Sequence, residues 1–153
     1  MQNETTSDLH TSPGAQPVDV QPSSAHSSEA VTHGIRIQVY PSYVPEQSSP
    51  ELFRFSFSYR VVITNEGEQK VKLLSRHWLI INSDGDQETV DGPGVVGYTP
   101  ELEPGESFEY TSHCPINTPW GTMEGTYSMI KESGEKFDAE VGRFYLVSDD
   151  VLA

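Results

Sequence analysis

The chain has 153 residues, a length that favours one compact domain with at most a tail. It carries 9 Lys and Arg against 23 Asp and Glu, which gives a formal net charge of -14. A surface this acidic repels a phosphate backbone, so we expect no nucleic-acid partner.

The single cysteine, Cys114, excludes an internal disulfide framework and a zinc finger built on cysteines. A lone thiol suits a reducing compartment, so we expect a cytoplasmic protein. The N-terminal thirty residues contain no Lys or Arg and no signal-like apolar run, and the longest strongly apolar stretch, Trp78–Ile81, is too short to cross a bilayer. We therefore expect no secretion signal and no membrane insertion.

Residues 1–33 are dominated by Ser, Thr, Gln, Pro and His, whereas all 7 Tyr, 6 Phe and 2 Trp lie at or beyond Tyr40. So few apolar side chains cannot offset the entropy of ordering that segment. We therefore predict a disordered tail over residues 1–33 and a folded domain over residues 34–153. His10, His26 and His33 of the tail lack a ligand spacing that would hold a metal.

From Gly34 onward the apolar residues alternate with a period of two, which is typical of strands in an antiparallel sheet. Ile35, Ile37 and Val39 mark a first strand. The clearest strand is predicted at Leu52–Asn65, with six large residues on one face. They are Phe53, Phe55, Phe57, Tyr59, Val61 and Ile63.

The next predicted strand, Gln69–Asn82, loses its alternation near Leu73-Leu74, where a bulge would return Trp78 and Ile80 to the core. The remaining strands are predicted at Gln87–Val90, Tyr98–Glu103, Ser107–His113, Gly125–Lys131 and Glu135–Val147. Turns are expected at Ser83-Asp84-Gly85, Pro104-Gly105 and Ser133-Gly134. No segment has a helical period, so the fold predicted is all-β: an antiparallel sandwich like that of immunoglobulin and fibronectin type III domains.

Gly92, Gly94 and Gly97 match the Gly-x-Gly-x-x-Gly fingerprint of dinucleotide-binding proteins. That fingerprint acts through a strand, a tight turn and a helix N-terminus, and no helix is predicted here. Two hypotheses remain for this segment: an amide nest for an anion, or a loop that needs unusual backbone angles.

Acidic residues gather at Asn82–Glu88 and at Glu101–Glu109, but neither segment has the spacing of an EF-hand. A charged hairpin tip and a solvated face explain them. His113 and Cys114 are sequence neighbours, so a strand would point them to opposite faces. We find no hydrolase, zinc-protease or phosphate-loop motif, so we predict no catalytic residues, no resident metal and no cofactor.

The connection His113–Met123 places Trp120 in a loop stiffened by two prolines, Pro115 and Pro119, and Trp is enriched at interaction hot spots. If every strand reverses direction, the Glu66–Glu68 turn, the glycine loop and the Trp loop share one end of the sandwich, where loops commonly bind partners. The alternative is that Trp120 plugs the end of the core. The candidate ligand- or partner-binding residues are Gly92, Gly94, Val95, Val96, Gly97, Tyr98, Trp120, Gly121 and Met123.

Three ordered motifs resemble the ApaG family. They are Gly92-Pro93-Gly94-Val95-Val96-Gly97, then Pro100-x-Leu102-x-Pro104-Gly105-Glu106-x-Phe108-x-Tyr110-Thr111-Ser112, then Thr118-Pro119-x-Gly121-Thr122-Met123-x-Gly125-x-Tyr127; Arg76-His77-Trp78 and the aromatic strand before it agree. The resemblance spans residues 34–149. It implies a fibronectin-like sandwich, and it does not rescue dinucleotide binding, because the family carries the glycine pattern outside a Rossmann fold.

The resemblance also links the chain to cobalt resistance and magnesium efflux, as for stand-alone bacterial members, and to protein contacts, as for eukaryotic relatives that carry the domain in an F-box protein and a polymerase delta-interacting protein. We therefore predict a non-enzymatic domain that binds a protein partner, with a homodimer left open. The alternative is a sensor that binds a phosphate, a nucleotide or a divalent cation at the Gly92–Gly97 loop or on the acidic surface.

Overall fold

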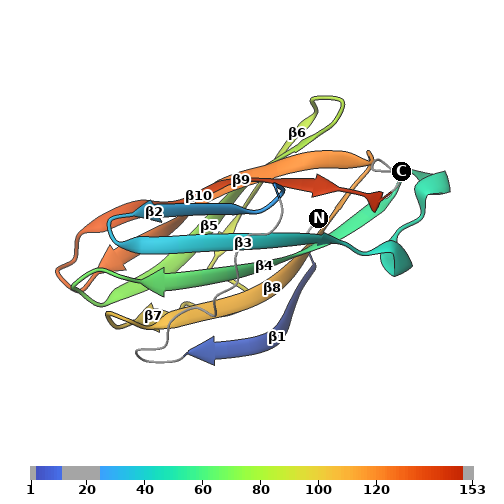
Figure 1. The fold of residues 1–153 in the computed structure, drawn as a ribbon. Coiled ribbons are helices and arrows are strands. Elements are labelled where there is room, and N and C mark those ends of the chain that lie inside the picture. The colour runs from blue at the N-terminus through green and yellow to red at the C-terminus, as the bar shows by residue number, and fades with distance from the viewer. Residues whose placement is uncertain (1–2, 12–24, 150–153) are drawn as a thin grey trace.

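The computed structural model describes residues 3–11 and 25–149, which form two antiparallel sheets packed face to face (Figure 1). One sheet has the order β1 (Asn3–Thr11), β8 (Ser107–Ile116), β4 (Phe55–Asn65), β3 (Ile35–Tyr43) and β2 (Ser28–Thr32). The other has the order β10 (Lys136–Val147), β9 (Trp120–Lys131), β5 (Val71–Asn82) and β6 (Gln87–Pro93), and β7 (Glu101–Leu102) also pairs with β5. The predicted all-β sandwich is confirmed.

The helical part of the described chain is two short 3₁₀ turns, η1 (Pro45–Gln47) and η2 (Pro50–Leu52). In the residues that the structure describes, no helix has the length and apolarity needed to span a membrane.

The core lies between the sheets and is built from the alternating side chains of both. Trp78 is 1% exposed and packs edge-on against Tyr59, Tyr127 and Phe144, with ring centroids 5.6, 5.9 and 5.9 Å away. Edge-to-face contact places the positive rim of one ring on the negative face of the next. The bulge expected near Leu73-Leu74 is present as a register shift between Leu73 and Ser75, and it returns Trp78 and Ile80 to the interior as predicted.

Two strands fall inside the range 1–33 that the sequence assigned to a tail. β2 pairs with β3 over its whole length, and β1 pairs with β8. The folded part therefore begins before Gly34, while residues 12–24 of the predicted tail lie outside the described residues. β2 is an edge strand that is held mainly by backbone hydrogen bonds to β3. None of its side chains is fully buried, and Val31 is 49% exposed. Its sequence therefore lacks the alternating apolar residues that mark the other strands.

The aromatic strand begins later than predicted, at Phe55. Phe53, which we expected in the core, adopts a left-handed backbone conformation with φ 55° and is 71% exposed. The cause is the turn before it, where Ser49 and Arg54 exchange backbone hydrogen bonds of 2.8 and 3.1 Å around η2. This closed turn rotates the side chain of Phe53 away from the sheet.

The Trp loop also differs from its prediction. Strands β8 and β9 occupy most of His113–Met123, and residues 117–119 alone connect them. β6 and β7 both run antiparallel to β5, so the chain keeps its direction through the glycine loop instead of reversing. Trp120 consequently lies at the end of the β5–β6 hairpin, opposite the Glu66–Glu68 turn, and the predicted cluster of three loops at one end is wrong.

Candidate functional site

The glycine loop packs into the sandwich at Gly94–Val96, whereas Tyr98 at its end is 47% exposed. Gly94 and Gly97 have φ values of 60° and 85°, and Val96 between them has φ 42°. This path turns the side chains of Val95 and Val96 inward, where they are 0% and 8% exposed. A β-carbon on Gly94 would lie 2.2 Å from the carbonyl oxygen of Tyr98, so only glycine fits there.

Three backbone amides of the loop, those of Gly94, Val95 and Tyr98, have acceptors within the fold. The Gly94 amide donates to the carbonyl of Leu74 at 2.9 Å, and Val95 and Tyr98 exchange hydrogen bonds of 2.8 Å. Arg76 donates from Nη1 to the carbonyls of Pro93 and Gly94, both at 3.0 Å. A phosphate nest needs several convergent amides, and three of the loop's amides are engaged within the fold. The geometry therefore supports the architectural interpretation of the glycine motif.

Trp120 lies at the start of β9 and is 42% exposed, so it does not plug the core. Met123 of the same strand is fully buried, and Gly121 is buried against the backbone of β5, where a β-carbon would meet the Ile81 carbonyl oxygen at 2.7 Å. Of these three predicted site residues, Trp120 alone presents a large side chain to the surface.

Tyr145 is the exposed neighbour of Trp120. β9 and β10 pair Trp120 with Val147 and Thr122 with Tyr145, while β5 places Ile81 on the other side of Thr122. Because the residues between them face the core, these side chains share the outer face of the second sheet. We call the surface of Trp120, Tyr145, Ile81 and Leu79 the tryptophan face; Trp120 and Tyr145 are 42% and 37% exposed, and the other two are partly exposed.

The connection that carries Trp120 is fixed by hydrogen bonds. The Thr118 hydroxyl donates to the Trp120 carbonyl at 2.7 Å and accepts from the Ser83 amide at 3.1 Å. The Ser148 amide donates to the carbonyl of Pro119 at 2.9 Å. The tryptophan face is therefore held on a rigid scaffold. Trp120 and the glycine loop are far apart. Along β5, the distance from Leu74, which accepts from the Gly94 amide, to Asn82 beside Trp120 is about 25 Å, at about 3.3 Å per residue.

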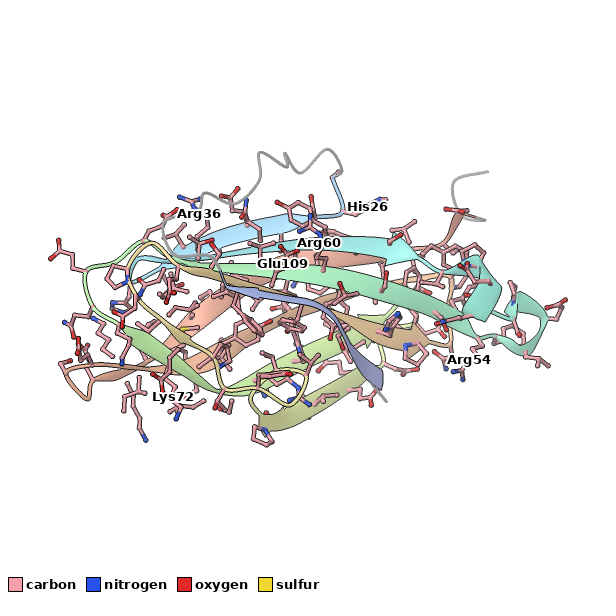
Figure 2. The ribbon with its side chains drawn as sticks, turned by 90° about the horizontal axis from the view of Figure 1, so that it is seen from below. His26, Arg36, Arg54, Arg60, Lys72 and Glu109 are labelled. Atoms are coloured by element: carbon pink, nitrogen blue, oxygen red, sulfur yellow. The ribbon has the colours of Figure 1, made fainter. Side chains whose placement is uncertain are left out.

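A groove opens at the same end of the sandwich, between η2, the end of β8 and the β5–β6 hairpin. We call it the end groove; it encloses about 660 Å³. Its apolar wall is made by Leu52, Phe53, Pro115 and Ile116, with Ile80 beneath them. Its polar wall is made by Asn82, Asp86, Gln87, Glu88 and Asn117. Figure 2 shows Arg54, which also lines the groove, at this end of the molecule and Lys72 at the other.

Titratable groups elsewhere are held in pairs. His77 contacts Asp91 across β5 and β6, and Arg60 bonds to Glu109 at 3.0 Å on the outer face of the first sheet. Burial raises the pKa of the Cys114 thiol to about 12, which keeps it protonated and unreactive. Among the residues that the structure describes, no group of three or more His, Cys, Asp or Glu side chains could hold a metal ion.

The sequence pattern pointed away from the end groove, because Phe53 fits the alternation of a core strand. Leu52 and Arg54 likewise flank Phe53 in a way that resembles a continuous strand. The one available signal was Pro50, which cannot donate in a sheet ladder and marks the end of a strand or a turn.

Comparison with known proteins adds an independent line of evidence. Residues 45–131 match the family model described as the ApaG domain. The chain is 52% identical over 120 residues to Protein ApaG of Anaeromyxobacter dehalogenans, covering 78% of this chain and 94% of that protein. It is 51% identical over 121 residues to Protein ApaG of Bradyrhizobium diazoefficiens, covering 79% of this chain and 93% of that protein.

A solved structure agrees with the fold. The putative ApaA protein of Bordetella pertussis superposes with a TM-score of 0.74 at 45% identity, covering 75% of this chain and 94% of that one. The sandwich, the three motifs and these matches lead to one conclusion: the chain belongs to the ApaG family.

Proposed function

We propose that the protein is a non-enzymatic binding domain whose tryptophan face makes contact with a protein partner. The observation that carries this proposal is the exposure of Trp120 and Tyr145, 42% and 37%, side by side on a fixed sheet. Trp and Tyr dominate interaction hot spots, because they bury a large area and lose little side-chain entropy.

The surroundings of the face support a protein partner. Thr122 lies between Tyr145 and Ile81 and is 8% exposed, so the face is continuous there. An ion pair between Arg143 and Glu124, 2.8 Å apart, follows along the strands. An apolar centre beside charged residues is the usual anatomy of a protein interface.

We propose in addition that the cellular role is linked to divalent-cation resistance or efflux, involving cobalt and magnesium. This part rests on the family resemblance. Under the proposal, the domain affects cation levels indirectly, through its protein partner. The reason is that the tryptophan face is apolar and suits a protein contact better than a cation.

Site-specific photocrosslinking in cells tests the contact. A photoreactive phenylalanine analogue at Tyr145 should give a discrete crosslinked product, and the same analogue at Glu140, exposed on the same strand, should give none. Adding Trp120→Ala should abolish the product without changing the melting temperature. Equal crosslinking from both positions, or a product indifferent to Trp120→Ala, would overturn the assignment of this face.

Growth in cobalt tests the cellular role separately. Cells lacking the protein should become cobalt-sensitive, wild type should restore growth, and Trp120→Ala should fail to restore it. Restoration by Trp120→Ala would separate the cation role from this face.

A further inference from the structure

We propose that the end groove is a second recognition site, distinct from the tryptophan face, and that it binds an extended peptide segment combining apolar side chains with Lys or Arg. The volume of about 660 Å³ lies within the range of about 300–1,000 Å³ that ligand sites occupy. An apolar wall, an acidic wall and a strand edge meet in this one place.

The apolar wall presents its side chains to solvent from a closed turn. Leu52 and Phe53 are 76% and 71% exposed, the two most exposed of the large apolar residues within 25–149. Single exposed apolar residues are common, but these two border the same hollow as Ile116 and the buried Ile80. Together they form a continuous apolar lining.

The backbone holds Phe53 outward at an energetic expense. A non-glycine residue at φ 55° is sterically disfavoured, because its β-carbon comes too close to the following carbonyl oxygen. The turn is nevertheless fixed, because the Leu52 amide donates to Ser49 at 2.9 Å and the Phe53 amide donates to Pro50 at 3.0 Å. A strained residue that points a large ring into water is the kind of outlier that marks recognition sites.

The opposite wall is acidic. Asp86 and Glu88 line the groove, and Glu88 pairs with Ile80 across β5 and β6, on the inward side of the sheet. Arg54 is the one Lys or Arg among the lining residues, so carboxylates outnumber cations there. A ligand that fills this groove therefore needs a cationic group beside its apolar one.

An extended peptide fits better than a compact ligand, because the start of β6 borders the groove. Within the described strands β6 pairs with β5 alone and forms the edge of its sheet. An edge strand offers backbone donors and acceptors to an added strand, and the alternating side chains of that strand can reach two different walls.

Charge disfavours the other occupants. A second copy of this chain, with a net charge of -14, would bring its own acidic groups to Asp86 and Glu88. Nucleic acid and an anionic membrane surface carry the same unfavourable sign.

The test uses the full chain and a fluorescently labelled peptide of alternating Leu and Lys, at an ionic strength of about 0.15 M to screen nonspecific attraction. Saturable binding is expected, and a peptide of alternating Leu and Glu, or of Ser and Lys, should bind at least about tenfold more weakly. Phe53→Asn and Glu88→Gln should each raise the Kd for the Leu–Lys peptide by at least about tenfold.

Two matched variants serve as controls: Val31→Ser removes another exposed apolar side chain, and Glu140→Gln removes another exposed carboxylate. Both should bind like wild type. Loss of binding in the controls, equal binding of the Leu–Glu peptide, or self-association that Phe53→Asn abolishes would each overturn the proposal. Because Trp120→Ala leaves the groove intact, this variant should bind the peptide normally. The proposal for the end groove can therefore be overturned without affecting the proposal for the tryptophan face, and the reverse also holds.

Discussion

The glycine loop and the turn that carries Phe53 use the same backbone device in opposite directions. In the loop, left-handed residues at Gly94, Val96 and Gly97 turn two valines into the core. In the turn, one left-handed residue sends Phe53 into solvent. The glycine pattern therefore reflects what packing of the core demands, whereas the strained turn that holds Phe53 in solvent is the basis of the proposed recognition site.

The largest expected effect concerns the loop. Gly94→Ala would place a β-carbon 2.2 Å from the Tyr98 carbonyl oxygen at φ 60°, so we expect a loss of about 3 kcal/mol or more in the free energy of unfolding. Gly97→Ala, where nothing lies within 4 Å, should lose only about 1 kcal/mol of conformational preference. Urea denaturation measures both, and equal losses would contradict the packing role of Gly94.

The next effect tests whether water reaches the core at Cys114, the residue before Pro115 of the end groove. Burial raises the pKa of Cys114 from 9.0 to about 12 in the folded chain. A raised pKa stabilises the fold fully below about pH 9, and that stabilisation is lost as the pH rises toward about 12.

Between about pH 8 and about pH 10.5, the unfolding free energy of wild type should fall by about 2 kcal/mol more than that of Cys114→Ala. Urea denaturation at both pH values gives the difference. Parallel decreases in the two proteins would show that water reaches the thiol.

A smaller effect, of opposite sign, concerns the turn. Asn tolerates the left-handed conformation, and the exposed ring of Phe53 gives up little contact, so Phe53→Asn should raise the unfolding free energy by about 0.5–1 kcal/mol. Calorimetry should show a melting temperature about 2 °C higher, alongside weaker peptide binding. A lower melting temperature would mean that Phe53 serves stability instead of recognition.

The smallest expected effect is none. Because the amides of Gly94, Val95 and Tyr98 are engaged within the fold, ATP or Mg²⁺ at about 1 mM should leave the amide resonances of residues 92–98 unshifted. Saturable shifts confined to this segment would favour the sensor hypothesis over the architectural one.

The sequence predicted what depends on alternation. Buried Ile35, Phe57 and Trp78 all follow from a period of two with one bulge. It failed where alternation carries no information. β2 pairs through its backbone with few buried side chains, and Phe53 keeps the alternation while the backbone turns away.

The end of the sandwich that carries Trp120 was predicted wrongly for a topological reason. A loop between two strands usually reverses the chain, but β6 and β7 run in the same direction along β5. The glycine loop thus connects two strands that run in the same direction. This path depends on the packing of Val95 and Val96 into the core, and the sequence alone does not show that these two side chains are buried.

The side of the sandwich where β2 lies beside β10 has a consequence for how the chain acquires its structure (Figure 1). There the Tyr145 amide donates to the carbonyl of His26 at 2.9 Å, and the Glu140 amide donates to the Thr32 hydroxyl at 3.1 Å. These contacts join parts of the chain that are far apart in sequence, so they form late and slow the folding reaction. During synthesis, β2 cannot make these contacts until β10 has emerged from the ribosome, because Thr32 and Glu140 are 108 residues apart in the chain.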